Sequence, residues 1–198
     1  MILGIYTASQ PYSLAIVAPD QTVHASLSRR ASVETLTIAA ICDLASITLQ
    51  AITAVGVVTG PGGYTATRIG VTIANTIAQG LGVPLYGLSS LDVMAYATQG
   101  VSGVVLATKP TTRHYTAVQL YAVSQGETAL PHIRCLSDIT LLTTEQLANL
   151  RDTSPVRVIA CSEAAVYACT IARWVAMQPM VPQAIYQPVR AYYAHDPV

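Results

Sequence analysis

The sequence predicts an α/β fold with mixed sheets in two lobes. Short apolar runs bounded by Gly, Pro or Ser, typical of strands, alternate with longer segments whose apolar residues recur every three or four positions, typical of helices. The chain has 198 residues and is 52% hydrophobic, which suits one large domain or two small lobes. A boundary near Gly100–Gly103 is expected to divide a lobe over residues 1–100 from a smaller, divergent lobe over residues 101–198.

Three strands, then alternating helices and strands, are predicted over the first half of the chain. Ser9-Gln10-Pro11 separates the first two strands, Ser32 supplies a helix cap, and Ser89 with Asp92 forms a capping-box pattern that begins a helix to about Gln99. The other predicted elements are strands over Ile2–Tyr6, Ser13–Val17 and Thr22–Leu27, a helix over Ser32–Leu49, a strand over Ala54–Thr59, a helix over Thr65–Leu81 and a strand over Pro84–Gly87. This order is that of the actin-like, ribonuclease-H-like α/β fold.

The second half of the chain repeats the theme loosely. Its predicted elements are strands over Val104–Ala107, Tyr115–Val123 and Ala129–Leu136, a helix over Thr144–Leu150, a strand over Val156–Cys161 and a helix over Ser162–Met177. Gly126-Glu127 is expected in a hairpin turn. The proline-containing tail from Pro179 is expected to be irregular and to pack along the surface.

The segment Val57–Val71 is the most informative one. It combines a buried strand, the turn Gly60-Pro61-Gly62-Gly63 and a helix start that Thr65 or Thr67 can cap. Glycines let the backbone turn sharply and approach a neighbour closely, and the free N–H groups of a helix start attract an anion. The loop is therefore either an oxyanion or nucleotide cradle or a tight packing corner. Arg68 either anchors it through backbone carbonyls or faces a carboxylate or phosphate across an interface.

Residues 60–70, GPGGYTATRIG, resemble the GPGSFTGxRIG signature of the TsaB (YeaZ) proteins, bacterial partners in making threonylcarbamoyladenosine on tRNA. The likeness continues through residues 78–91, AQGLGVPLYGLSSL, and the opening MILGIYTAS resembles the family's ILAIDTA. Good matching covers about the first half of the chain, and the second half matches only in its order of elements. The resemblance implies an actin-like fold, a TsaD-like catalytic partner and a TsaE-like ATPase in the assembled complex.

Two carboxylates expected of an actin-like phosphotransferase are missing. Tyr6 stands where the family often has Asp, and a phenol that is uncharged near neutral pH is a poor magnesium ligand. The family's later Asp-x-Arg is replaced by residues 108–113, TKPTTR, in which only the basic residue has a counterpart. We therefore expect no catalytic residue and no cofactor in this chain, with ATP and metal held by the partner subunit.

Histidines and cysteines are not spaced for a metal site. The four histidines include no His-x-x-x-His pair like that of the catalytic paralogue TsaD, and the four cysteines form no Cys-x-x-Cys. The long charge-free runs are broken by Gly, Pro, Gln and Asn, and no signal peptide is evident, so we expect a cytoplasmic protein without a membrane partner. Because ten basic and ten acidic residues cancel, tRNA is expected to bind only through the complex.

Two predicted helices have apolar residues on more than one face and few charges. In Thr65–Leu81, a row of small residues runs beside an isoleucine stripe and allows close approach of either this protein's own sheet or another chain. The apolar faces of Ser32–Leu49 require burial under the second lobe or in a partner. TsaB proteins pair through their first two helices, with themselves or with TsaD. The resemblance thus implies an interface at Leu36, Ile38, Ile41, Cys42, Ala45, Ala66, Gly70, Ala74 and Ala78.

These patterns together predict a non-catalytic scaffold subunit of the complex that forms N6-threonylcarbamoyladenosine at position 37 of tRNA, docked to a TsaD-like catalytic subunit and able to form a homodimer when alone. The alternative is an independent nucleotide-binding phosphotransferase that uses the Gly60–Gly63 loop. A third hypothesis is a homodimeric binding protein with no role on tRNA.

Overall fold

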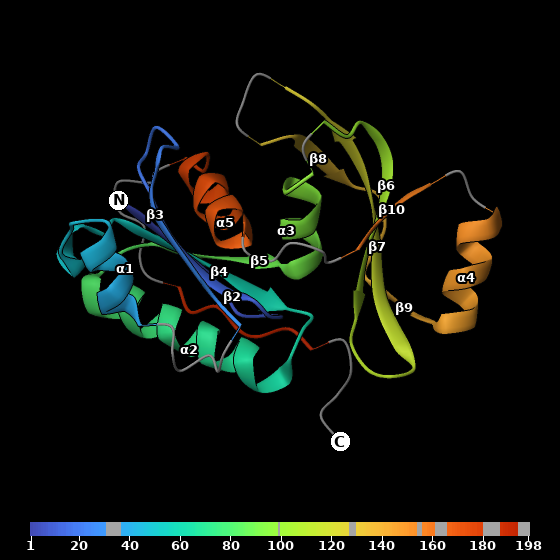
Figure 1. Cartoon of the computed structure of the whole chain (residues 1–198), viewed down its shortest axis with the longest axis horizontal. Coiled ribbons are helices and arrows are strands. Elements are labelled where there is room, and N and C mark those ends of the chain that lie inside the picture. The colour runs from blue at the N-terminus through green and yellow to red at the C-terminus, as the bar shows by residue number, and fades with distance from the viewer. Residues whose placement is uncertain are drawn as a thin grey trace.

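The computed structural model (Figure 1) describes residues 1–30, 37–98, 100–126, 130–153, 156–160, 166–179 and 187–193. Within these ranges the chain forms two five-stranded sheets and five α-helices. The helices lie in layers outside and between the two sheets (Figure 1). This is the two-lobed α/β architecture that the sequence predicts.

The first sheet has the strand order β3-β2-β1-β4-β5. Its central strand β1 runs antiparallel to β2 and parallel to β4. Because β1 and β4 are parallel, their carboxyl ends meet at one edge of the sheet. The elements of this part of the chain are β1 (Ile2–Tyr6), β2 (Tyr12–Val17), β3 (Val23–Arg29), α1 (Ile38–Leu44), the short 3₁₀ helix η2 (Leu49–Ala51), β4 (Ala54–Gly60), α2 (Tyr64–Leu81), β5 (Leu85–Ser89) and α3 (Ser90–Tyr96).

The second sheet has the order β10-β6-β7-β8, and β9 pairs with β7 beside β8. Strand β6 is antiparallel to β7 and parallel to β10. Its elements and those that follow are β6 (Gly103–Pro110), β7 (Tyr115–Ser124), β8 (His132–Cys135), β9 (Thr140–Thr143), α4 (Thr144–Thr153), β10 (Arg157–Ala160) and α5 (Tyr167–Ala176).

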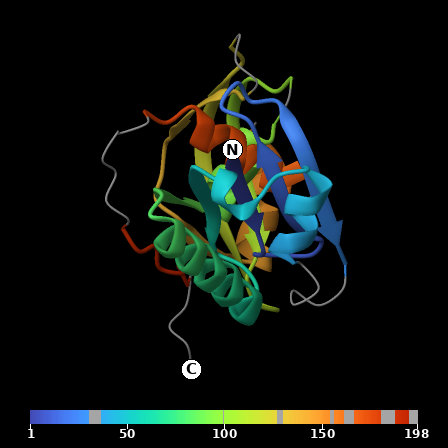
Figure 2. The same cartoon turned by 90° about the vertical axis from the view of Figure 1, so that its left-hand side faces the viewer.

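Both faces of the first sheet are covered by helices. Side chains alternate along β1, so that Leu3 and Ile5 pack with α1 and α2 while Ile2 and Tyr6 pack on the side of α5. Figures 1 and 2 show α1 and α2 on one side of the sheet and α5 on the other. This double cover explains why all five residues of β1 are apolar or aromatic and buried.

Helix α5 belongs to the second half of the chain but packs on β1, β2 and β4 of the first sheet. Residues 187–193 also return there: the Asn75 side chain in α2 donates to the Val189 carbonyl oxygen at 2.9 Å and accepts from its N–H at 3.1 Å. These residues have no regular secondary structure, as predicted for the tail. Each sheet is therefore built from one half of the sequence, but the first sheet is covered in part by a helix and a segment from the other half.

Most predicted elements are confirmed, with one helix shorter and one strand missed. The capping box is present, since the Ser89 side chain accepts from the N–H of Asp92 and the Asp92 side chain accepts from the N–H of Ser89. Helix α1 ends at Leu44 rather than Leu49 because Ser46 takes a left-handed φ of 54° and the Ile47 N–H turns back to the Cys42 carbonyl oxygen. Strand β9 was not predicted. Helix α1 also begins later than predicted, at Ile38, with Thr37 rather than Ser32 as its N-cap. Ser32, the predicted helix start Ser162 and the turn residue Glu127 lie outside the described residues.

Candidate functional site

The Gly60–Gly63 loop leads from β4 into α2 at the edge of the sheet where β1 also ends. Gly60 has a φ of +112°, which side chains rarely adopt, and a Cβ there would collide with the carbonyl oxygen of Tyr192. The Tyr192 N–H donates to the Thr59 carbonyl oxygen at 2.7 Å. The C-terminal segment thus lies against the start of the loop, and only glycine fits there.

The middle of the loop is packed against Ala8, two residues after the end of β1. A Cβ on Gly62 would collide with the carbonyl oxygen of Ala8 and lie 2.7 Å from its Cβ. The Gly63 N–H donates to the same carbonyl oxygen at 2.8 Å, and the buried Ser90 hydroxyl donates to the Pro61 carbonyl oxygen at 2.6 Å. An oxyanion cradle needs free N–H groups, and that of Gly63 is already engaged. The geometry matches the packing-corner interpretation.

The start of α2 differs from the prediction that Thr65 or Thr67 caps it. The helix begins at Tyr64 after Gly63, which provides no side-chain cap. Thr65 is exposed on the first turn, whereas Thr67 is buried and its hydroxyl has no hydrogen-bond partner among the described residues. A Cβ added to Gly63 would meet no atom closer than 3.9 Å. Gly63 therefore serves as the N-cap of α2, and close packing does not require a glycine at this position.

Arg68 does not anchor the loop through backbone carbonyls, and its other predicted role, facing a carboxylate or phosphate across an interface, stays a prediction. Its guanidinium donates to the Tyr64 hydroxyl at 2.7 Å and lies 5.1 Å from the centre of the Tyr64 ring. The Tyr64 ring in turn lies 4.9 Å from that of Tyr193. Arg68 and Tyr64 are both exposed, so they form a cationic and aromatic patch beside the loop rather than an anchor for its carbonyls.

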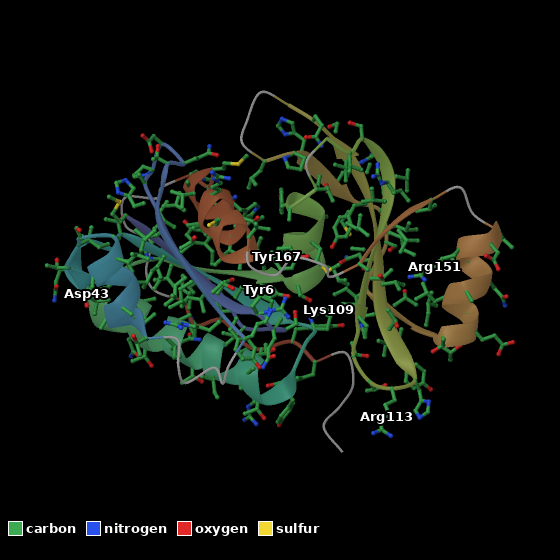
Figure 3. All side chains as sticks on the ribbon, in the orientation of Figure 1. Tyr6, Asp43, Lys109, Arg113, Arg151 and Tyr167 are labelled. Carbon is green, nitrogen blue, oxygen red and sulfur yellow. The ribbon has the colours of Figure 1, made fainter. Side chains whose placement is uncertain are left out.

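A buried polar cluster joins the two sheets beside the loop. Lys109 in β6 donates to the hydroxyl of Tyr6 at 2.7 Å and to that of Ser9 at 3.2 Å, and the Tyr6 and Ser9 hydroxyls are 2.9 Å apart. Lys109 is 2% exposed and Tyr6 is fully buried. The ring of Tyr167, from α5, contacts that of Tyr6 edge to face at 4.9 Å, and Figure 3 shows the three side chains converging. β1, β6 and α5 therefore meet at this cluster.

The cluster places a phenol and an ammonium group at the end of β1. A carboxylate there would attract a divalent cation, whereas the Lys109 ammonium group repels one, and ammonium groups do not ligate metals while protonated. Arg113, the basic residue with a counterpart in the family pattern, lies exposed between β6 and β7 and away from Tyr6 (Figure 3). The side-chain contacts of this junction thus include those of a buried cation that donates to two hydroxyl groups.

Sequence reasoning singled out Tyr6 and residues 108–113 as two separate departures from a family pattern, and missed that Tyr6 and Lys109 meet. The two residues lie in different sheets, so no strand-pairing register could predict their contact. One signal was present: Lys109 is the only lysine of the chain and ends an otherwise uncharged, apolar strand. A charge in such a strand is rarely buried without a partner.

Tyr6→Phe is expected to lower the free energy of unfolding by about 1.5–3 kcal/mol, because it removes a buried hydrogen bond to a charged group. In a Lys109→Met background the same change should cost less than about 1 kcal/mol, since the charged donor is gone. Urea unfolding of the two single variants, the double variant and the parent protein measures this coupling. Equal costs of Tyr6→Phe in both backgrounds would contradict an energetic link between the sheets here.

The predicted interface residues of α1 divide into two groups. Ile41 and Cys42 are buried in the core beneath the helix, whereas Ile38 and Ala45 are half-buried at its margin. Leu36 lies outside the described residues. The prediction that Ile41 and Cys42 face a partner therefore needs correction, because their side chains pack on this chain's own sheet.

The row of small residues on α2 is also buried within the chain. A Cβ on Gly70 would collide with the Thr7 hydroxyl and lie 3.0 Å from the Thr7 Cβ, because α2 packs closely on the end of β1. The other members of the row, Ala66, Ala74 and Ala78, are at most 8% exposed. The prediction that these four residues face a partner is corrected in favour of the alternative, close packing on the sheet.

The outer surface of these two helices is formed by other residues. Leu44 at the end of α1 is 59% exposed, and Leu49 shortly after it is 36% exposed. On α2 the stripe Ile69, Ile73, Ile77 and Leu81 is half-buried beside exposed threonines. Asp43 and Arg68 are the only charged residues of α1 and α2. The face is therefore weakly charged, with partly covered apolar side chains.

Among the described residues, no three His, Cys, Asp or Glu side chains gather closely enough to hold a metal ion. Within the same ranges, no helix has both the length and the hydrophobicity that spanning a membrane requires.

Comparison with known proteins relates these features to a family. A model described as "TsaD: tRNA N6-adenosine threonylcarbamoyltransferase" matches residues 13–128, more than half of the chain. The tRNA threonylcarbamoyladenosine biosynthesis protein TsaB of Bacillus subtilis (strain 168) is 34% identical over 85 residues, which make up 43% of this chain and 36% of that protein. An uncharacterized protein of Mycobacterium tuberculosis (strain ATCC 25618 / H37Rv) is 35% identical over 111 residues, 52% of each chain. The match thus spans between about a third and a half of these relatives.

Solved structures agree over nearly the whole chain. YeaZ from Pseudomonas aeruginosa superposes with a TM-score of 0.70 at 20% identity, covering 88% of this chain and 91% of its own. A protein described by its similarity to peptidase YEAZ from the same organism superposes with a TM-score of 0.69, also at 20% identity, covering 96% and 99%. At this identity the likeness defines the class of protein: an α/β protein of the actin-like, ribonuclease-H-like fold. With the family model added, the chain belongs to the TsaB (YeaZ) family.

Proposed function

We propose that this chain is a non-catalytic scaffold subunit in the formation of N6-threonylcarbamoyladenosine at position 37 of tRNA, and that it docks to a TsaD-like catalytic subunit. Membership of the TsaB family supports the pathway, since the Bacillus subtilis relative is named for threonylcarbamoyladenosine biosynthesis. In this proposal ATP and metal are held by the partner, a TsaE-like ATPase joins the assembled complex in the cytoplasm, and tRNA is reached through the complex.

The observation that carries the non-catalytic role is the Tyr6–Lys109 contact at the end of β1. An actin-like phosphotransferase needs a carboxylate there to hold the metal of its nucleotide. Here a buried ammonium group lies 2.7 Å from the phenol oxygen at that position. Placing a magnesium ion next to it would bring two positive charges together in a site shielded from water, which is strongly unfavourable.

The outer face of α1 and α2 supports the docking role. It carries the exposed Leu44 and the half-buried isoleucine stripe of α2, and it has few charges. The cores of protein interfaces are likewise apolar and poor in charged residues. We place the docking contact there, at Ile38, Ala45 and these outer side chains. The same face would serve a homodimer when the catalytic partner is absent.

The alternative, an independent nucleotide-binding phosphotransferase, fits the geometry less well. Its phosphate cradle would be the Gly60–Gly63 loop, but the Gly63 N–H donates to Ala8 and the Pro61 carbonyl oxygen is bound by Ser90. The third hypothesis is a homodimer with no role on tRNA, which differs from the proposal both in its partner and in its function.

The test is reconstitution with purified subunits. The chain alone should show no magnesium-dependent ATP turnover, and modification of tRNA should require it together with TsaD-like and TsaE-like subunits and the threonylcarbamoyl donor. A phosphate-release assay with Mg-ATP checks the first point, and mass spectrometry of modified nucleosides checks the second.

ATP turnover that disappears when Tyr6 or Lys109 is changed would favour the phosphotransferase instead. Full modification of tRNA without this chain, together with failure to co-purify with a TsaD-like protein, would favour the homodimer with no role on tRNA.

A further inference from the structure

A pocket of about 250 Å³ is lined by residues of β5, α3, β7, β8 and α5 and by none from the loop, α1 or α2. Its wall includes three aromatic side chains, Tyr96, Tyr121 and Trp174, and one carboxylate, that of Asp92. Its remaining wall is apolar or uncharged and contains no lysine or arginine. The pocket is thus aromatic and carries one negative charge, and the proposed function does not use it.

The polar floor of this pocket has one hydrogen-bond acceptor too many. The Tyr121 oxygen lies 2.7 Å from Asp92 Oδ1 and 2.5 Å from Gln119 Oε1, yet it carries a single proton. The Gln119 amide cannot simply be reversed, because its nitrogen donates to the Ser137 carbonyl oxygen at 3.0 Å. Burial, and next the charge of Asp92, raise the pKa of Tyr121, so the phenol keeps its proton and does not become a second anion beside Asp92. The Ser89 hydroxyl also hydrogen-bonds to Tyr121, but the single phenol proton can satisfy only one of its two acceptors, so either Asp92 Oδ1 or Gln119 Oε1 lacks a donor.

The aromatic walls, like the unsatisfied acceptor, favour a ligand that is an organic cation with hydrogen-bond donors. The rings of Tyr96 and Trp174 lie 6.3 Å apart at 52° to each other, so they do not stack and each leaves part of its surface toward the pocket. Aromatic faces attract organic cations, most strongly at tryptophan, and a nearby carboxylate adds to the attraction. An anion would be repelled by Asp92, and a neutral ligand would use only the walls.

We propose that this pocket binds a small organic cation with N–H donors, a guanidinium or primary ammonium group, between Trp174 and Tyr96 and against the Asp92 carboxylate. The volume accommodates such a group with a short alkyl chain. The cation is either a free metabolite or the side chain of an arginine or lysine, and both present the same chemistry to the pocket.

Trp174 makes this proposal directly measurable, because it is the only tryptophan of the chain. Its fluorescence should change saturably when the intact protein is titrated with butylguanidinium at constant ionic strength. Butylurea has nearly the same shape without the charge, and should bind about tenfold more weakly or not at all. Butylammonium should behave like butylguanidinium. The tripeptide amide Gly-Arg-Gly is titrated in the same way. Tighter binding of the peptide than of butylguanidinium indicates an arginine side chain as the natural ligand, and the reverse order indicates a free cation. Saturable binding of the peptide or of butylguanidinium supports the site.

Two aspartate-to-asparagine variants, one in the pocket and one outside it, test where the cation binds. Asp92→Asn removes the charge of the pocket while keeping its shape, and should weaken binding of butylguanidinium about tenfold. Asp43→Asn removes one exposed carboxylate from α1, far from the pocket, and should leave the affinity unchanged. If Asp92→Asn does not fold, Tyr96→Leu tests the aromatic wall in its place. The proposal is overturned if butylurea binds as tightly as butylguanidinium, if neither gives a saturable change, or if Asp43→Asn weakens binding as much as the pocket variant.

Discussion

Replacing Gly62 by serine is expected to lower the free energy of unfolding by about 2–3 kcal/mol, as overpacking a tight core position does. The new Cβ would collide with the backbone carbonyl of Ala8, which cannot rotate aside as a side chain could. That carbonyl also accepts the Gly63 N–H, so moving it would cost a second contact. Urea unfolding followed by circular dichroism measures the loss.

The matched control is the same change one residue later. A Cβ on Gly63 meets nothing closer than 3.9 Å, and Gly63 occupies the N-cap of α2, where serine is a preferred residue. Gly63→Ser should therefore leave the stability within about 0.5 kcal/mol of the parent or raise it. Equal destabilisation by both variants would remove the packing-corner explanation of the loop.

Leu44→Glu is expected to weaken binding to a TsaD-like subunit about a hundredfold, equivalent to about 2.7 kcal/mol. Leu44 is 59% exposed in the free subunit, so the change should leave its fold intact. In the docked state an unpaired carboxylate would be buried among apolar groups, which costs several kcal/mol. Thr72→Glu makes the same test from the exposed side of α2. Isothermal titration with the purified partner gives the affinity of each variant.

A leucine of similar exposure on the second sheet provides the control. Leu136, 42% exposed after β8, lies away from α1 and α2, and Leu136→Glu should bind normally. Ala74, a residue of the small row, is unsuitable because it is fully buried, and a glutamate there would unfold the subunit. Folded Leu44→Glu and Thr72→Glu proteins that bind with unchanged affinity would refute docking through this face.

The first sheet could be predicted from sequence because its signals are local. Strand β1 is an uninterrupted apolar run, and α2 has both an isoleucine stripe and a row of small residues that recur every four positions. Strand β9 was missed because its four residues sit directly before a helix and are held only by pairing with β7, a non-local contact. The predicted helix over Ser32–Leu49 was too long at its C-terminal end because apolar periodicity continues past Leu44. The left-handed residue that ends the helix is Ser46, and only a glycine there would have marked the end in the sequence.

The candidate site was predictable only in part for the same reason. The loop glycines were visible, but which of them is indispensable depends on neighbours distant in sequence, Tyr192 for Gly60 and Ala8 for Gly62. The periodicity of α2 indicated that its row of small residues packs closely against another element. It could not distinguish this chain's own sheet from a partner chain. The pocket beside Trp174 is lined by residues of five elements, β5, α3, β7, β8 and α5, and left no pattern in the sequence.

The return of α5 to the first sheet has a consequence for how this protein is made. On the ribosome, β1, β2 and β4 emerge early, but the helix that covers one of their faces ends only at Ala176. The 80 residues from Ala97 to Ala176 take about 4–16 s to synthesise at typical rates of 5–20 residues per second. During that interval the face carrying Ile2 and Val17 lacks the cover of α5, so the nascent chain has an exposed apolar surface until α5 is made.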